Sequence, residues 1–546
     1  MNIIRKRNEN GKLSVHAIAG NYVVLLGINA EEEITDKLLG FAIYRIDHTE
    51  NEEYYLKGFK TFKEVEPNPQ PGSLVSTLEH PVQAFLWGDY TAKPAHSYTY
   101  KMESMYDDPR DLRQGDTVEI TIDTENVDLG EHAVFFNRGQ TASQAYAWKF
   151  GNRKPEDVPN REAYKWLSRG LEEGILGFIS KAKDKDYGLR AAVYEFSHLP
   201  VLKAFREANE RGVDVKIIYD SKKNKNHVKT SDEAIEKAGI RDLMERRKGA
   251  KSYIAHNKFI VLMRNGLPIE VWTGSANFTE SGIFGQSNVG HIVRNESIAK
   301  IYLEYWKELF DDPEAKELRE WVVPNTPVPT SLPVNEMIIP IFSPRRKITA
   351  LEYYAQLMDN AKETVCFTAA FGVNKKLAKV FAKDKPYLRY ILLERPGNNI
   401  DMVKRDIDNR VAIGATIGTG TADRWMDEIT GLGVHVRYVH TKYLLIEPLS
   451  NKPIVITGSA NFSDASVKKN DENMIVIYYN TKVADIYLGE FMRLFNHYYF
   501  RYIRKSQEAA PETTEREPAY LASDNSWCVP YYEEGSIKEK ERLLFG

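Results

Sequence analysis

The stretch IAHNKFIVL…WTGSANF (residues 254–278) recurs further along the chain as YVHTKYLLI…ITGSANF (residues 438–462). A fixed offset over two separate motifs indicates that one structural unit occurs twice. Each copy supplies an imidazole, an ammonium group, a hydroxyl and an amide, which together suit a phosphate group. Four polar residues recur 184 positions apart: His256, Lys258, Ser275 and Asn277 return as His440, Lys442, Ser459 and Asn461.

The spacing within each copy predicts a sheet that carries these side chains at one edge. His and Lys are two residues apart beside apolar runs, Phe259 to Leu262 and Tyr443 to Ile446, so at strand period they point to one face. GSAN follows a second predicted strand in each copy, Ile269 to Thr273 and Ile454 to Thr457. One copy gives a polar cluster, and two facing copies give a pocket with two imidazoles.

These motifs resemble the signature of the phospholipase D superfamily, HxK(x)4D followed by GSxN. The resemblance covers roughly residues 160 to 500. At the position of the superfamily's Asp, the first copy has Met263 and the second has Glu447. Thirteen residues after the GSxN serine, the second copy has Glu472, which matches the superfamily's acidic partner of the catalytic His, and the first copy has Asn288.

The resemblance implies a metal-independent phosphodiester hydrolase that needs no cofactor and works through a phosphohistidine at one site shared by both copies. His256 is the expected nucleophile, and His440, with Glu472 as its expected partner, is the general acid and then base. A carboxylate could equally activate a nucleophilic imidazole, so these roles could be reversed. The expected catalytic residues are His256, His440, Lys258, Lys442 and Glu472, and the expected phosphate-binding residues are Ser275, Asn277, Ser459 and Asn461.

Composition limits the other possibilities. A chain of 546 residues predicts several domains, and a net charge of −3 excludes a uniform polycation. Cys366 and Cys528 are too few for a disulfide framework, and no Cys/His spacing indicates zinc. The chain has neither an apolar leader at its start nor about 18 uninterrupted apolar residues, which predicts a cytoplasmic protein without a transmembrane segment.

Residues 1–150 predict a β-sandwich. Short strand-like runs alternate with turn-rich stretches, and the segment around Tyr98 resembles a fibronectin type III or immunoglobulin-like domain, with Tyr98 as a candidate tyrosine corner and Trp87 as a core aromatic. The histidines of this segment, His132 among them, are scattered and predict no site, so a packing module or a surface for a protein partner is expected. The predicted strands are His16 to Leu26, Gly40 to Ile46, Val82 to Trp87, Tyr98 to Met102 and Thr117 to Ile122.

Residues 160–325 and 334–505 predict two α/β halves, which pair about a pseudo-twofold axis. In each half a helix, a strand, a helix and a strand precede the HxK motif, and a strand and a long helix follow GSxN. The predicted elements before HxK are 169–182, 189–196, 200–212 and 213–220 in the first half, and 350–361, 364–372, 375–384 and 388–394 in the second.

Two insertions are expected to roof the site. Residues 222–251 contain ten Lys or Arg against five Asp or Glu, and the second insertion is glycine-rich around Gly414 to Gly420. Residues 506–518 predict a solvated linker. The tail, 519–546, is apolar enough to dock, either on the catalytic halves or on a partner.

The favoured substrate is DNA or RNA, because the basic insertion could follow a polyanion. One alternative is a phospholipid hydrolase or transferase, and another is a non-catalytic protein that binds phosphate polymers. The oligomeric state and the pathway stay open.

Overall fold

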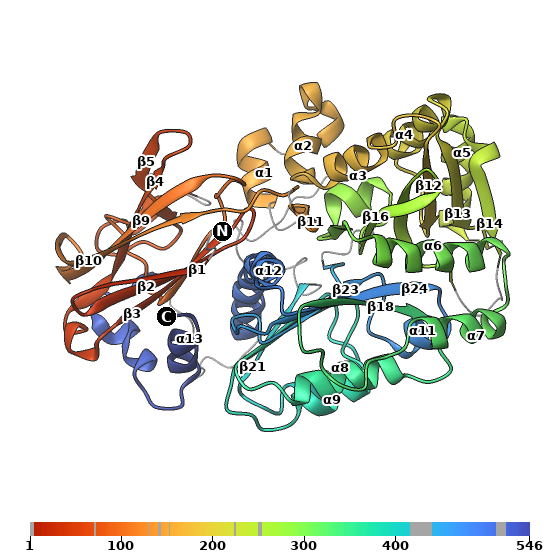
Figure 1. Ribbon diagram of the computed structural model, residues 1–546. Coiled ribbons are helices and arrows are strands. Elements are labelled where there is room, and N and C mark those ends of the chain that lie inside the picture. Colours follow the sequence, from red (N-terminus) through yellow and green to blue (C-terminus); the bar gives the residue numbers. More distant parts are fainter. Residues whose placement is uncertain are drawn as a thin grey trace.

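Two seven-stranded sheets with one shared topology form the two halves. The computed structural model describes residues 5–69, 73–128, 130–139, 143–151, 153–222, 225–248, 254–414, 439–508 and 520–546. The strand order is β11-β17-β16-β15-β12-β13-β14 in the first sheet and β18-β24-β23-β22-β19-β20-β21 in the second (Figure 1). The last three strands of each order run parallel, and the other neighbours run antiparallel.

The strands and helices follow the predicted order in both halves. The first half contains β11 (His132–Phe136), α1 (Ser143–Phe150), α2 (Glu162–Ser168), α3 (Leu171–Ser180), β12 (Tyr187–Val193), α4 (Leu199–Glu210), β13 (Asp214–Asp220), α5 (Asn226–Ala238), β14 (Met244–Arg247), β15 (Lys258–Arg264), β16 (Leu267–Gly274), β17 (Val289–Val293), α6 (Glu296–Phe310) and α7 (Ala315–Asn325). The second contains β18 (Met337–Ser343), α8 (Thr349–Asp359), β19 (Val365–Ala369), α9 (Lys375–Phe381), β20 (Arg389–Leu393), α10 (Ile400–Val403), β21 (Asn409–Ile413), β22 (Tyr443–Ile446), β23 (Ile454–Gly458), α11 (Asp464–Lys468), β24 (Glu472–Tyr478) and α12 (Thr481–Glu508).

The edge strand β11 lies within the segment 1–150 that the sequence assigns to the β-sandwich. It pairs antiparallel with β17 and occupies the same place in the first sheet as β18 does in the second. The run HAVFF is apolar enough for a strand, but its local pattern carries no information about which sheet it joins. The first half therefore takes a strand from upstream of its predicted boundary.

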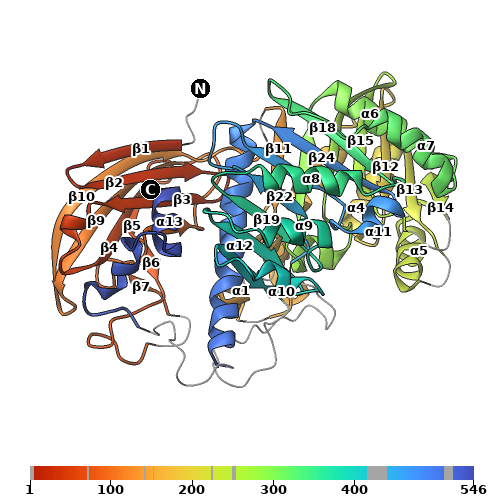
Figure 2. The same ribbon diagram turned by 90° about the horizontal axis from the view of Figure 1, so that it is seen from below.

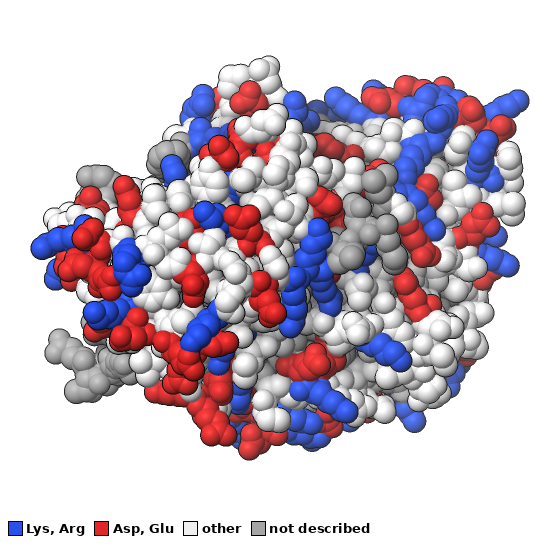
Figure 3. Space-filling model, turned by 60° about the vertical axis from the view of Figure 1, so that its left-hand side comes forward, with Lys and Arg blue, Asp and Glu red and all other residues white. Residues whose placement is uncertain are grey.

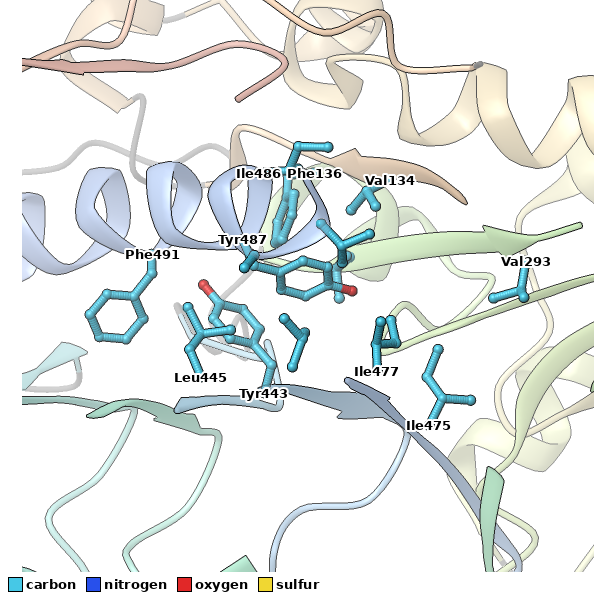
Figure 4. Packing of buried hydrophobic residues seen from close by; sticks show 14 of the residues in the cluster. Val134, Phe136, Val293, Tyr443, Leu445, Ile475, Ile477, Ile486, Tyr487 and Phe491 are labelled. Atoms are coloured by element: carbon cyan, nitrogen blue, oxygen red, sulfur yellow. The ribbon is translucent and has the colours of Figure 1, made fainter. Parts of the chain in front are cut away.

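An apolar core joins the two halves. Side chains from β11, β17, β22, β24 and α12 belong to one buried cluster, in which Phe136 packs edge to face on Tyr443 and Tyr487 (Figure 4). The long helix α12 of the second half runs between the N-terminal strands and the sheets of the two halves (Figure 2). The two sheets are thus held in a fixed relation, with the HxK motifs between them.

The N-terminal region is strand-rich and contains two antiparallel four-stranded sheets. Their orders are β1-β2-β3-β8 and β10-β9-β4-β5, and residues from both sheets share one hydrophobic cluster. The small pair β6–β7 lies beside them. The bounds are β1 (Arg5–Asn10), β2 (Leu13–Ala19), β3 (Val24–Ala30), β4 (Leu38–Asp47), β5 (Glu52–Tyr55), β6 (Lys57–Gly58), β7 (Val75–Ser76), β8 (Leu86–Asp89), β9 (Ser97–Asp108) and β10 (Asp111–Asp123).

One predicted strand of this region is wrong. The run His16 to Leu26 contains a tight turn in which Gly20 N donates to Val23 O, so it forms the end of β2 and the start of β3. Tyr98 is buried and its hydroxyl accepts from Lys93 N at 2.9 Å, whereas Trp87 is only partly buried. The fibronectin or immunoglobulin-like topology stays a prediction.

The C-terminal tail docks on the N-terminal sheets. Trp527 Nε1 donates to Leu38 O, Tyr532 OH donates to Ala30 O, and α13 (Ile537–Phe545) lies against β3. The same helix reaches the second half, where Lys540 pairs with Asp408. The tail therefore bridges the N-terminal sheets and one catalytic half.

Parts of the predicted insertions lie outside the described residues: 223–224, 249–253 and the glycine-rich 415–438. Most of the predicted linker, 509–518, does too. Among the helices that the structure describes, each is too short or too polar to cross a membrane.

Candidate active site

The two halves exchange backbone contacts at the HxK motifs. Ala255 forms a parallel bridge with Asp471, and Val439 forms the equivalent bridge with Ser287. His256 N donates to Asp471 O at 3.0 Å, and His440 N donates to Ser287 O at 3.2 Å. The segment before each HxK histidine is therefore aligned by the chain that follows GSxN in the other half.

This exchange gives His256 the carboxylate. His256 Nδ1 lies 2.8 Å from Glu472 Oε2, and both side chains are buried. The sequence predicts Glu472 as the partner of His440, and that prediction is wrong. The physical reason is the crossed backbone pairing, which places the residue after Asp471 beside the His of the first copy.

His440 has an amide partner instead. Its Nδ1 lies 2.9 Å from Asn288 Oδ1, while Asn288 Nδ2 donates to Gly282 O at 2.7 Å. The second bond fixes the amide orientation, so the atom facing His440 is an oxygen, which can only accept. His440 therefore carries a proton on Nδ1 and presents Nε2 to the site.

The two GSxN serines hold these partners. Ser459 Oγ donates to Glu472 Oε2 at 2.7 Å, and Ser275 Oγ donates to Asn288 Oδ1 at 2.8 Å. Each hydroxyl also accepts a backbone N–H from the following strand. This geometry differs from the predicted phosphate binding, because both hydroxyl protons are already used within the protein.

The glycine of each GSxN motif allows this close approach. A Cβ on Gly274 would lie 2.2 Å from Val289 O, and one on Gly458 would lie 2.2 Å from Asn473 O. Both glycines also have a positive φ, near 150°. Only glycine lets the serine reach the next strand here.

The lysines are buried beside their histidines. Lys258 Nζ donates to His256 O at 2.7 Å, and Lys442 Nζ donates to His440 O at 2.5 Å. Each ammonium group has three donors, and this bond uses one of them. The lysines thus supply positive charge at the bottom of the site.

The two asparagines differ in their surroundings. Asn277 Nδ2 donates to Glu195 Oε2 at 2.6 Å, and Asn461 N is held by Ser466 Oγ. The amide oxygens of both are buried without a hydrogen-bond partner. These oxygens only accept hydrogen bonds, so Asn277 and Asn461 can hold a phosphate oxygen only through their amide N–H groups.

Electrostatics favours a neutral His256 beside an ionised Glu472. Burial lowers the pKa of His256. The Glu472 carboxylate raises this pKa, and the charges of Lys258 and Lys442 lower it. Burial opposes ionisation of Glu472, but His256, Lys258 and the Ser459 hydroxyl together lower its pKa. Burial also lowers the pKa of Lys258 to about 8.

A chain of three further residues that the sequence did not reveal begins at His256. The Tyr194 ring contacts two imidazoles, with centroids 4.8 Å from His256 and 4.7 Å from His227. His227 Nε2 in turn lies 2.8 Å from Asp220 Oδ2. Asp220 ends the strand IIYD, so a polar residue at the end of a buried strand was the available signal.

The first insertion also anchors the site. Arg247, at the end of β14, is buried and pairs with Asp471 at 3.0 Å and with Asp312 at 2.8 Å. Burial raises the pKa of Asp471 to about 6 in spite of that partner. An insertion predicted only as a roof thus contributes a buried ion pair between the halves.

The positions of the superfamily's Asp have other uses in this chain. Met263 packs in the core, and Glu447 Oε1 accepts from Lys362 N and Glu363 N in the turn after α8. Among the described residues, no three metal-ligating side chains converge at the HxK motifs.

Comparison with known proteins agrees with this architecture. Two α/β halves with crossed HxK and GSxN motifs define a phospholipase D-like protein. The family model described as "Cardiolipin synthase, PLD-like domain" matches residues 175–310 and 355–495, just over half of the chain. The chain therefore belongs to this phospholipase D-like family, whose fold implies a phosphodiester substrate.

Solved structures show more distant likenesses. Phosphatidylserine synthase from Haemophilus influenzae Rd KW20 is 13% identical with a TM-score of 0.43, over 62% of this chain and 88% of that one. Nuc from Salmonella typhimurium, a phospholipase D family member, is 26% identical with a TM-score of 0.22, over 26% of this chain and 86% of that one. NucT from Helicobacter pylori is 16% identical with a TM-score of 0.23, over 30% of this chain and 98% of that one. No curated protein matches the chain.

Proposed function

We propose that this protein hydrolyses phosphodiester bonds in nucleic acid at one site shared by its halves. His256 is the nucleophile, and His440 is the general acid and then the base. The observation that supports this most is the crossed pairing of the two imidazoles, His256 with Glu472 and His440 with Asn288.

In the first step, His256 Nε2 attacks phosphorus. A P–N bond forms, the bond from phosphorus to the leaving oxygen breaks, and the proton on His440 Nε2 moves to that oxygen. The Nδ1–H of His256 points to Glu472, so the lone pair is on Nε2 and the carboxylate stabilises the charge that the ring gains.

In the second step, His440 Nε2 takes a proton from water. The hydroxide attacks phosphorus, the P–N bond breaks, and His256 returns to its neutral form. Lys258, Lys442, Asn277 and Asn461 hold the nonbridging oxygens, and each well-placed donor lowers the barrier by about 2 to 4 kcal/mol. Ser275 and Ser459 act as positioning residues, because they hold Asn288 and Glu472.

The start of α5 favours a polyanionic substrate. Lys225 and His227 lie in this segment, and His227 contacts the Tyr194 ring that packs on His256. A nucleic-acid strand that extends from the site would contact Lys225 and His227 next. Lys229 in α5 and Arg241 just after it already pair with acidic residues. Basic and acidic side chains are also interspersed on the face shown in Figure 3. We therefore expect the protein to bind nucleic acid through groups close to the entrance of the site.

The test is to trap the intermediate. Bis(p-nitrophenyl) phosphate has a leaving group that needs no acid, so His440→Ala should still form phosphoenzyme and accumulate it, because the base for step two is missing. His256→Ala should give no label. Alkaline quenching preserves phosphohistidine for peptide mapping, and DNA, RNA and phospholipid are assayed in parallel.

The results discriminate between the proposals. Label on His440 would reverse the two roles, and label on neither residue would refute covalent catalysis. About half of the activity in each single mutant would indicate two independent sites. Cleavage of phospholipid but of neither nucleic acid would overturn the substrate class and leave the mechanism standing.

A further inference from the structure

Two carboxylates and one imidazole meet where the edge strands of the two sheets begin. Glu131 and His132 lie at the start of β11, and Glu336 directly precedes β18. One ligand atom from each of the three side chains lies within 4.8 Å of the others. In the part of the chain that the structure describes, this is the one such group of His, Cys, Asp or Glu.

The two carboxylates occupy equivalent places in the two halves, and each is oriented by an asparagine. Asn295 Nδ2 donates to Glu131 Oε1 at 2.8 Å, and Asn480 Nδ2 donates to Glu336 Oε1 at 2.5 Å. The same asparagines cap the first turns of α6 and α12 through their side-chain oxygens. One oxygen of each carboxylate is therefore held, and the other is left for a ligand.

A chain of hydrogen bonds fixes the proton on His132. Tyr487 OH donates to Thr457 Oγ1 at 3.3 Å, so the Tyr487 oxygen must accept from His291 Nδ1, 3.0 Å away. A neutral His291 then has no proton on Nε2. His132 Nδ1, 2.9 Å from that atom, must donate to it.

His132 Nε2 is consequently a bare lone pair. This atom is buried and has no hydrogen-bond partner. A buried lone pair beside two carboxylates lacks a donor, and a cation would supply what all three groups need.

We infer that Glu131, His132 and Glu336 bind a divalent transition-metal ion that joins the two halves. One imidazole and two carboxylates suit Zn²⁺, with water completing a tetrahedral site. His291 and the two asparagines are the outer partners that such a site requires.

The position indicates a structural ion. Asn288, the partner of His440, lies just before β17, and His132 pairs with Val293, the last residue of β17. The five residues of β17 span about 17 Å, and this length separates the proposed metal site from the HxK histidines. The ion would fix the start of β11 to the start of β18. The motif is invisible to sequence spacing because His132 and Glu336 are far apart in the chain.

The test measures zinc binding by the full-length protein after EDTA treatment and dialysis. We expect one equivalent of Zn²⁺ by calorimetry and elemental analysis, a rise in melting temperature of several degrees, and visible absorption of a tetrahedral site with Co²⁺. Glu336→Gln is exposed and keeps an acceptor for Asn480, so it should fold normally and lose at least tenfold in zinc affinity. His132→Ala should lose as much, and His48→Ala, an exposed histidine elsewhere, should lose nothing.

Unchanged uptake in Glu336→Gln and His132→Ala, or no uptake by the unmodified protein, would overturn the inference. EDTA should lower the melting temperature and leave phosphodiester cleavage intact at a temperature where the metal-free protein is folded. If Glu336→Gln loses cleavage with EDTA and regains it with Zn²⁺, the ion binds at another place. That result would also contradict the proposed site.

Discussion

One carboxylate distinguishes the imidazoles of the two HxK motifs. His256 and His440 each have a Lys two residues on and an Nδ1 that points to a side chain of the other half. The partner is charged for His256 and neutral for His440. A carboxylate stabilises an imidazole that becomes positive on attack, whereas an amide leaves an imidazolium free to release its proton.

We expect Glu472→Gln to lower kcat by about 10²- to 10⁴-fold, because the hydrogen bond to His256 stays and the charge is lost. The KM should change little, since no phosphate contact is removed. Steady-state kinetics and the rate of phosphoenzyme formation with an activated substrate check this. Asn288→Asp is the matched control: it adds a carboxylate to His440 and should slow the first step far less. Equal losses in the two variants would contradict the division of roles.

Lys258 should make substrate binding sensitive to pH. Its pKa of about 8 means that the ammonium group is charged at pH 7 and neutral by about pH 9.5. The KM for a phosphodiester should therefore rise as the pH passes 8, because one phosphate ligand loses its charge. Lys258→Met should show a high KM at every pH and no rise. A variant that keeps the rise would show that another group titrates.

At the level of elements, the sequence predicts the repeated helices and strands but not the backbone pairing that crosses between the two halves. The eight elements predicted before the HxK motifs lie within a few residues of their predicted ranges, because amphipathic helices and buried strands have clear periods in the sequence. They are α3, β12, α4 and β13 in the first half and α8, β19, α9 and β20 in the second. Which half supplies the partner of His256 depends on a bridge between Ala255 and Asp471. No local pattern records such a bridge, so Glu472 was placed beside the wrong histidine.

Edge strands were hidden for the same reason. β11 comes from the segment predicted as a sandwich, and β14 comes from the basic insertion. The sequence assigns the first segment to a sandwich from its alternating strand-like runs and turns, and the second to a roof from its position before the HxK motif. In the fold, β14 places Arg247 on Asp471, and β11 brings His132 to Glu336. A histidine that looks scattered in the sequence gains its meaning from the strand that joins the sheet.

For the whole molecule, the tail adds to the direct contacts between the N-terminal sheets and the two halves. Phe545 is buried, its carbonyl oxygen lies 3.0 Å from His16 Nδ1, and its ring packs on Tyr390 of β20. The apolar residues of the tail predict docking, but the docking surface combines two regions that the sequence describes separately.

Gly27 offers a direct test of this connection. A Cβ at this position in β3 would lie 1.9 Å from Phe545 O, which is backbone and cannot rotate away. Gly27→Ala should therefore push the end of α13 off the sheet and cost about 2 to 4 kcal/mol, from the clash and the lost burial of Phe545. Thermal unfolding and limited proteolysis of the tail are the measurements. Gly177→Ala, in α3 with open space around its Cβ, should instead stabilise the protein by about 0.5 to 1 kcal/mol. A tail that stays protected in Gly27→Ala would refute the docking of α13 against β3.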